Sequence, residues 1–121
     1  MTNDEYFTEL VGHFPSLSDI IEEDSSMIHY RMERFAEYAI DQITNNNLLE
    51  LNGCFSFQEA RIDKMSPELI NALNVSYCEA LLLGKAASKM NEVTTLMPPK
   101  LLNAYLSYEK YYHDLWKKSK E

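Results

Sequence analysis

Apolar residues recur every three or four positions along most of the chain, which is the spacing that places them on one face of an α-helix. The clearest stripe runs from about Met27 to Thr44. Its apolar members are Ile28, Met32, Phe35, Ala39 and Ile43. Charged side chains lie off this stripe, so the segment is predicted to form an amphipathic helix with one buried face.

An earlier helix is predicted at the start of the sequence. Thr2 or Asn3 can cap it, and it should end near Phe14 because Pro15 restricts the residue that precedes it. A short helical turn that includes Ile20 is expected next.

Three more main helices follow from the same spacing. They are predicted at residues 48–62, at 67–87 and from 98 towards the C-terminus, with a connector at 90–97. The helix at 67–87 is apolar on several sides, including Val75 and Leu83, which is typical of a central helix. No strand is predicted, so we expect one all-α domain spanning residues 1–121, a stack or bundle of five main helices and one short helix.

Helix ends and breaks have recognisable residues. Asn45–Asn47 should end the second main helix and cap the next one, because Asn tolerates a left-handed backbone. Ser66 and Pro67 form a helix start, with Ser as the cap and Pro at the first helical position. Gly53 lies inside the helix at 48–62, where Gly costs about 1 kcal/mol relative to Ala. We expect a neighbouring helix to approach closely at this position.

Composition narrows the class of protein. The chain has 121 residues with only 3 Gly and 4 Pro, which argues against an all-β fold rich in turns. No run of 18 apolar residues is present, and the acidic start does not resemble a signal peptide. A cytoplasmic protein without membrane contact is therefore expected, with Cys54 and Cys78 as reduced, buried thiols.

Charge is concentrated in the first half. Residues 1–60 carry twelve Asp or Glu against two Arg, while the rest of the chain is slightly basic. An acidic surface repels phosphate backbones, so nucleic-acid binding is not expected. It attracts basic protein surfaces instead, although acidic helices also serve simply to keep a small protein soluble.

A six-residue pattern occurs twice. Phe55–Ala60 (FSFQEA) returns 20 residues later as Val75–Ala80 (VSYCEA), which suggests two successive helices built on one plan. Glu59 and Glu79 occupy equivalent positions on apolar faces, where a carboxylate must be partnered or neutralised. They are either structural residues that bond an amide, Tyr or Arg, or functional acids that line a groove between helices.

Catalytic and metal motifs are not recognised. No Gly-x-Ser-x-Gly, Gly-rich phosphate loop or His-Glu-x-x-His is present. A di-iron bundle needs Glu-x-x-His pairs, but His29 and Glu33, like Glu109 and His113, are four residues apart. We therefore expect no catalytic residue, no cofactor and no metal. The last helix is rich in Tyr, and Tyr111 lies off its apolar stripe as a candidate interface residue.

Phe14-Pro15-x-Leu17, the long middle helix and the repeated pattern resemble a family of small bacterial all-α proteins of unknown function, which is similar to toxin-immunity proteins. The resemblance implies a short tandem-helix stack of the HEAT or armadillo kind. It also implies a protein partner, such as a basic toxin domain, and it transfers no catalytic residue.

The function that we predict is a protein-binding module, immunity-type or inhibitor-like, that docks a basic partner through its acidic N-terminal half. The predicted binding residues are Glu22, Glu23, Asp24, Glu33, Glu37, Asp41 and Tyr111. The alternative is a small enzyme or ligand-binding bundle that uses Glu59 and Glu79 in an inter-helix groove. The oligomeric state is left open.

Overall fold

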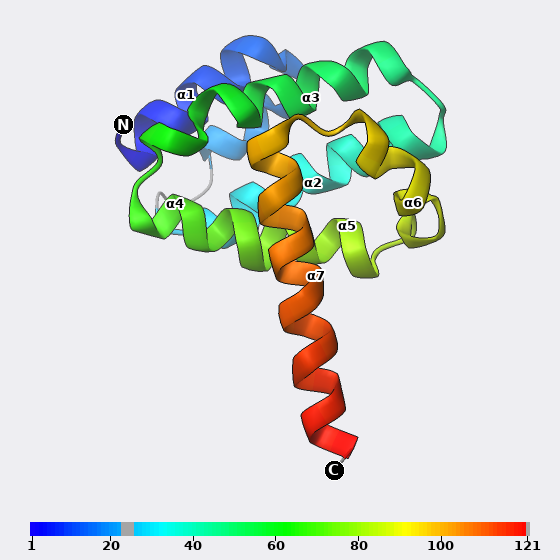
Figure 1. The fold of residues 1–121 in the computed structure, drawn as a ribbon. Helices are drawn as coiled ribbons and strands as arrows, with labels where there is room; N and C mark the ends of the chain where they lie inside the picture. The colour runs from blue at the N-terminus through cyan, green and yellow to red at the C-terminus, as the bar shows by residue number, and fades with distance from the viewer. Residues whose placement is uncertain (23–25, 121) are drawn as a thin grey trace.

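The computed structural model describes residues 1–22 and 26–120, and over these residues it contains helices and no strand (Figure 1). The chain is thus a single all-α domain, as its periodicity predicts. Its α-helices are α1 (Asn3–His13), α2 (Ile28–Thr44), α3 (Leu48–Arg61), α4 (Pro67–Ala72), α5 (Glu79–Leu83), α6 (Met90–Val93) and α7 (Pro99–Lys120). The 3₁₀ segments are η1 (Pro15–Glu22), η2 (Ile62–Lys64), η4 (Ala87–Lys89) and η5 (Thr94–Leu96), and η3 (Leu73–Cys78) is a π-helix.

The helix starts are set by side chains close in sequence. The hydroxyl of Thr2 accepts a hydrogen bond from the third amide of α1, and Ser66 does the same for α4. Asn47 caps α3, and Asn46 before it has a φ of 56°, the left-handed conformation expected where α2 ends. These local signals explain why the predicted helix boundaries are confirmed to within one or two residues here.

The predicted helix at 67–87 is a continuous rod made of α4, η3 and α5, and it ends four residues early, at Leu83. Gly84 has an extended backbone and its amide donates to the carbonyl oxygen of Ala80 at 2.9 Å. The predicted connector at 90–97 is itself largely helical, because α6 and η5 occupy it.

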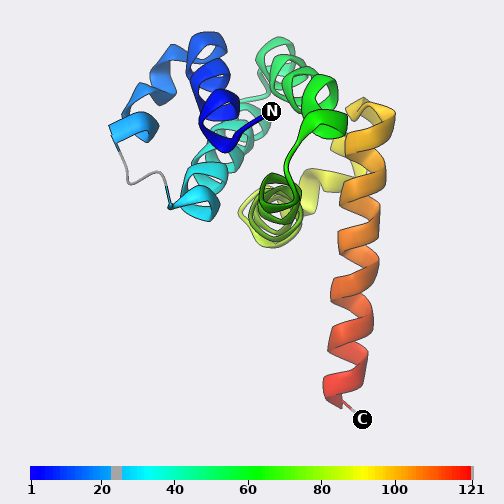
Figure 2. The same cartoon turned by 90° about the vertical axis from the view of Figure 1, so that its left-hand side faces the viewer.

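Helix α2 lies at the centre of the packing and contacts five other elements. It packs against α3, α4, η3, α5 and η1, while α7 crosses α3, η3 and α5. Figures 1 and 2 place α1 and α3 at one end of the body and the rod of α4 and α5 towards the other, with α2 between them. The last part of α7 projects from the body on the side opposite α1 and α3.

Aromatic rings fill the centre of the body. Phe35 of α2 is fully buried, and its ring centroid lies 5.4 Å from Phe14, 5.7 Å from Phe57 and 5.4 Å from Tyr77. Edge-to-face and tilted contacts of this kind add about 0.5–1.5 kcal/mol per pair beyond the area that they bury. The cluster joins Phe14, which directly precedes η1, to α2, α3 and η3 in one core.

One polar pair is buried within this core. The hydroxyl of Tyr6 donates to Oε1 of Gln58 at 2.7 Å, and both residues are completely shielded from solvent. Burial raises the pKa of Tyr6, so the phenol stays protonated and keeps donating. The bond fixes α1 against α3, because breaking it would leave the side-chain oxygen of Gln58 without a donor in the interior.

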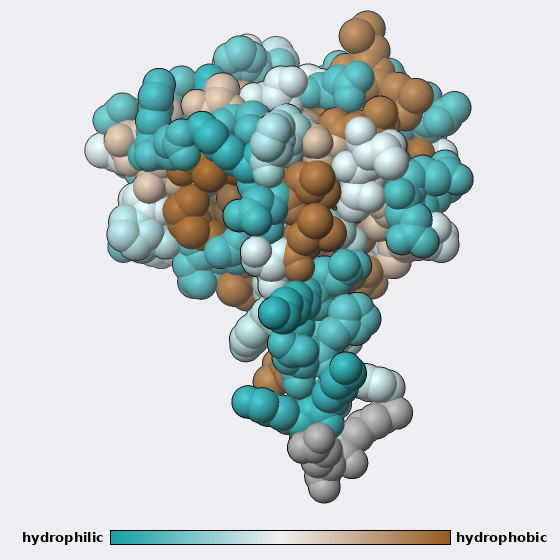
Figure 3. Space-filling view, viewed as in Figure 1, coloured by the Kyte–Doolittle hydropathy of each residue, from teal (hydrophilic) through white to brown (hydrophobic). Residues whose placement is uncertain are grey.

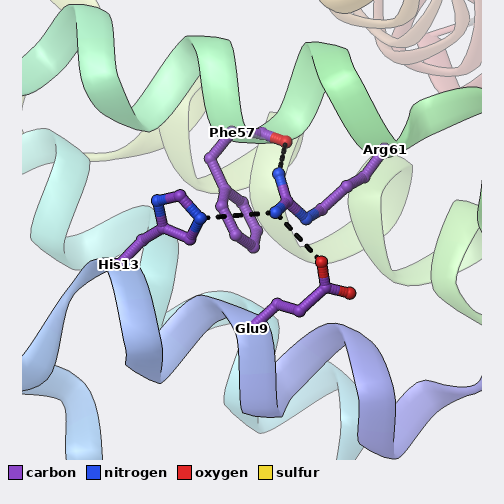
Figure 4. Close-up of polar contacts among 4 residues, drawn as sticks. All are labelled: Glu9, His13, Phe57 and Arg61. Atoms are coloured by element: carbon purple, nitrogen blue, oxygen red, sulfur yellow. Dashed lines mark hydrogen bonds and ion pairs between the residues drawn. The ribbon is translucent and has the colours of Figure 1, made fainter.

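Arg61 makes a second connection between α1 and α3 at the surface (Figure 4). Its guanidinium donates to Glu9 of α1 at 3.1 Å and to the carbonyl of Phe57 at 3.1 Å, and it lies 3.5 Å from Nε2 of His13. The guanidinium carbon is 3.8 Å from the centroid of the Phe57 ring, so the cation also stacks on an aromatic face.

Gly53 and Gly84 have opposite surroundings, and the expectation that a neighbouring helix approaches Gly53 closely is wrong. Apart from the backbone of α3 itself and the two adjoining residues, no described atom lies within 4 Å of a Cβ added at Gly53, which is exposed, so no other described helix approaches it closely. A Cβ added at Gly84 would collide with the backbone oxygen of Ala80 and lie 3.3 Å from Cδ1 of Ile40. The position that requires glycine is therefore at the end of α5, and the one inside α3 does not.

We predict that Gly53→Ala raises the free energy of unfolding by about 0.5–1 kcal/mol, because Ala loses less backbone entropy in an exposed helix. Gly84→Ala should lower it by about 1–3 kcal/mol, because the methyl group overpacks against fixed backbone. Urea denaturation followed by circular dichroism measures both changes. Equal effects of the two substitutions would contradict the difference in their surroundings.

Candidate functional site

A groove runs between α2 and the rod formed by η3 and α5. Its volume is about 890 Å³. It is lined by His29, Glu33, Glu37, Ile40, Asp41, Val75, Ser76, Glu79, Ala80, Leu83, Gly84 and Lys85. The lining combines acidic side chains with an apolar surface, which is the composition of a binding groove rather than of a packed core.

The acidic side chains come mainly from one face of α2. Glu33, Glu37 and Asp41 are spaced by four residues, which places them one above another along the helix. Within the described residues, neither the carboxylate of Glu33 nor that of Glu37 forms a hydrogen bond or an ion pair. Asp41 pairs with Nζ of Lys85 at 3.0 Å, and both side chains are more than half exposed, so this pair contributes about 0–1 kcal/mol.

Glu79 closes the groove on the side of α5. Its carboxylate accepts a hydrogen bond of 2.5 Å from the hydroxyl of Tyr108 on α7. Burial, together with this carboxylate, raises the pKa of Tyr108, so the phenol remains a donor. The wall of the groove is thereby connected to the helix that projects from the body.

His29 lies at one end of the groove. Its Nδ1 is 2.8 Å from Oγ of Ser76, and its Nε2 is 3.5 Å from the side-chain nitrogen of Asn71. These contacts join the start of α2 to the rod of α4 and η3 on the opposite side of the groove.

Glu59 lies elsewhere, at the start of α7. Its two carboxylate oxygens accept hydrogen bonds from the backbone amides of Lys100 at 3.0 Å and Leu101 at 2.8 Å. Amides at a helix start have no partner within the helix, and the helix dipole favours a negative charge there. Glu59 therefore caps α7 from another helix, and it does not line the groove with Glu79.

The remaining predicted binding residues are spread over the molecule. Glu22 is the exposed last residue of η1 and does not line the groove. Glu23 and Asp24 lie outside the described residues. Tyr111 is 58% exposed on α7, also away from the groove lining.

Sequence reasoning missed two apolar contributors to the groove. Val75 and Leu83 were expected in a buried stripe but are 43% and 48% exposed. Neighbouring residues of the same rod, such as Tyr77 and Leu81, are fully buried. The available signal was that the rod has more apolar residues than one buried face can use.

Among the described residues, no group of three or more His, Cys, Asp or Glu side chains is placed to hold a metal ion. Over the same part of the chain, no helix combines the length and the hydrophobicity needed to cross a membrane.

Comparison with known proteins gives a family. The model of the family described as "Domain of unknown function (DUF7674)" matches residues 7–113, so the chain belongs to this family. No curated protein matches the chain. No solved structure matches it either.

We predict that Glu59→Ala lowers the free energy of unfolding by about 2 kcal/mol, because two amides at the start of α7 lose their acceptor. Glu59→Gln keeps one acceptor oxygen and should lose about half as much. Hydrogen exchange adds a local measurement, because the amides of Lys100 and Leu101 should exchange faster in both variants. Glu92→Ala on α6 is the matched control, since Glu92 is exposed. Unchanged stability and unchanged exchange in Glu59→Ala would contradict the capping role.

Both cysteines are free and buried, and burial raises the pKa of Cys54 and of Cys78 to about 12. The thiolate is the reactive form, so the folded chain should not react with a thiol reagent such as DTNB at neutral pH. Two thiols per chain should react after denaturation. Rapid modification of either cysteine under native conditions would contradict the packing described here.

Proposed function

We propose that the chain is a protein-binding module, and that the groove between α2 and the η3–α5 rod receives a basic segment of a partner protein. The observation that carries this proposal is the pair Glu33 and Glu37, two exposed carboxylates on one face with no partner within the described chain. Like charges four residues apart destabilise a helix by about 0.2–0.5 kcal/mol per pair. A lysine or arginine bound in the groove would turn this repulsion into attraction.

The groove also offers apolar contact. Ile40, Val75 and Leu83 lie between the acidic side chains, so a bound segment would bury hydrocarbon while its cationic groups reach the carboxylates. An amphipathic helix with basic and apolar positions three or four residues apart fits this pattern. The formal charge of −8 adds long-range attraction, which speeds the encounter with a basic surface.

Within this proposal the partner is a basic toxin domain, and the chain acts as an immunity-type or inhibitor-like protein. The support is chemical: a small acidic helical domain with an acidic groove suits the masking of a basic surface. The proposal includes a tandem-helix arrangement of the HEAT kind. It is supported by the repeated pattern, whose two copies lie on α3 and on η3–α5, each in contact with α2 and α7.

The test is binding to a synthetic amphipathic peptide that repeats Leu and Lys at helical spacing. Glu33→Gln with Glu37→Gln should weaken its affinity about three- to tenfold at low salt, because two exposed ion pairs are lost. The affinity of the unmodified chain should also fall as ionic strength rises.

The matched control is Glu5→Gln with Glu92→Gln, which changes the net charge equally at exposed positions outside the groove. If both double variants lose the same affinity, the attraction is to net charge alone and the groove is not the binding site. Fluorescence anisotropy of a labelled peptide measures each affinity.

A further inference from the structure

Among residues 1–22 and 26–120, no other element lies beside the outer part of α7. After Tyr108, which bonds Glu79, the helix extends away from the body (Figures 1 and 2). Yet it carries large apolar side chains: Tyr111, Leu115 and Trp116 are 58%, 52% and 51% exposed. Exposed apolar residues gathered on one element mark an interaction surface more often than scattered ones do.

These side chains form a face of the projecting helix. Tyr111 and Leu115 are four residues apart, as are Tyr112 and Trp116, which is the spacing of one helical face. Tyr112, Leu115 and Trp116 border a shallow hollow of about 460 Å³, together with Lys118 and Ser119. A helix in water owes most of its stability to burial of such a face, so an uncovered one predicts a partner.

The charge of this segment identifies the kind of partner. Its last residues include Lys117 and Lys118, both exposed, and Lys118 borders the apolar hollow. The surface of the projecting part seen in Figure 3 is mostly hydrophilic. A basic amphipathic helix of this type complements an acidic groove with apolar lining, and this chain has one, lined by Glu33, Glu37 and Glu79.

We propose that the projecting part of α7 docks in the groove between α2 and η3–α5 of a second copy of this chain, with Lys118 facing Glu33 and Glu37 and Lys117 adding positive charge at the same end of the helix. The inference rests on the proposed function, because it assigns an occupant to the same groove. A partner protein would then have to displace the second copy.

The placement of the two elements allows the contact to be reciprocal. The hydrogen bond from Tyr108 to Glu79 brings the base of the projecting helix to the edge of the groove of its own chain. From Tyr108 the remaining residues reach about 18 Å at 1.5 Å per residue. Two copies related by a two-fold axis can therefore exchange these helices, and the exchange closes with two equal contacts.

A membrane surface is the other host for a basic amphipathic helix. The formal charge of −8 opposes it, because anionic lipids would repel the acidic body that adjoins the helix. The acidic groove favours the second copy instead.

The experiment is a measurement of mass in solution by light scattering, over micromolar to millimolar concentrations of the full chain. The unmodified chain should form a dimer that weakens as salt is added. Lys117→Glu with Lys118→Glu should weaken dimerisation at least about tenfold, as should Glu33→Lys with Glu37→Lys. An equimolar mixture of these two double variants should form a heterodimer. At one contact the acidic helix of the first variant meets the basic groove of the second, and at the other contact the native lysines meet the native glutamates.

Lys64→Glu with Lys89→Glu is the matched control for the lysine variant, since both residues are exposed outside α7. It should leave the dimer unchanged. Circular dichroism checks that every variant is folded.

A monomer at all concentrations would overturn the inference, and so would a dimer that neither double variant weakens or a mixture that does not associate. Capture of the unmodified chain by anionic phosphatidylserine vesicles, with no dimer in solution, would overturn it in favour of a lipid surface. The Leu–Lys peptide distinguishes failure of this inference from failure of the proposed function. If the chain binds the peptide through Glu33 and Glu37 but stays monomeric, the groove is still a binding site for basic segments, and only its occupation by a second copy is overturned.

Discussion

The carboxylate of Glu59 determines where the last helix begins. Both of its oxygens are used by amides of Lys100 and Leu101, so α3 fixes the start of α7 as firmly as a residue of α7 itself could. Two turns later, Tyr108 is held by Glu79, the equivalent residue of the repeated pattern. One pair of acids, twenty residues apart in sequence, thus sets both the origin and the direction of α7. The projecting face and its relation to the groove follow from that direction.

The acids of this protein therefore divide into two groups by what they contact. Glu59 and Glu79 bond donors on α7, whereas Glu33 and Glu37 of α2 have no such donor within the described residues. A helix face with several carboxylates is tolerated because water screens it. Removing that water becomes favourable only when cations replace it, which is the physical basis for a groove that selects basic ligands.

Local features of the sequence were sufficient for much of the fold. The stripe of Ile28, Met32 and Phe35 predicts α2, and the caps Thr2, Asn47 and Ser66 act within three residues, so they can be read directly. The groove could not be predicted in this way, because Glu33 and Glu79 line the same groove only through the packing of α2 against η3 and α5. Gln58 shows the same limit: it lies beside Glu59 on α3, and only the position of Tyr6 on α1 decides that the amide is the buried member.

The π-helical segment η3 (Leu73–Cys78) has a consequence for length variation in this region. A π turn arises when a helix accommodates one additional residue, and each residue of an α-helix advances by about 100°. Losing one residue from η3 would therefore let the π turn close into ordinary α geometry without rotating the residues after it. Glu79 would still face Tyr108, and the same side chains of α5 would face α2. Losing one residue from the regular helix α4 would instead turn everything after it by about 100° and present another recognition surface.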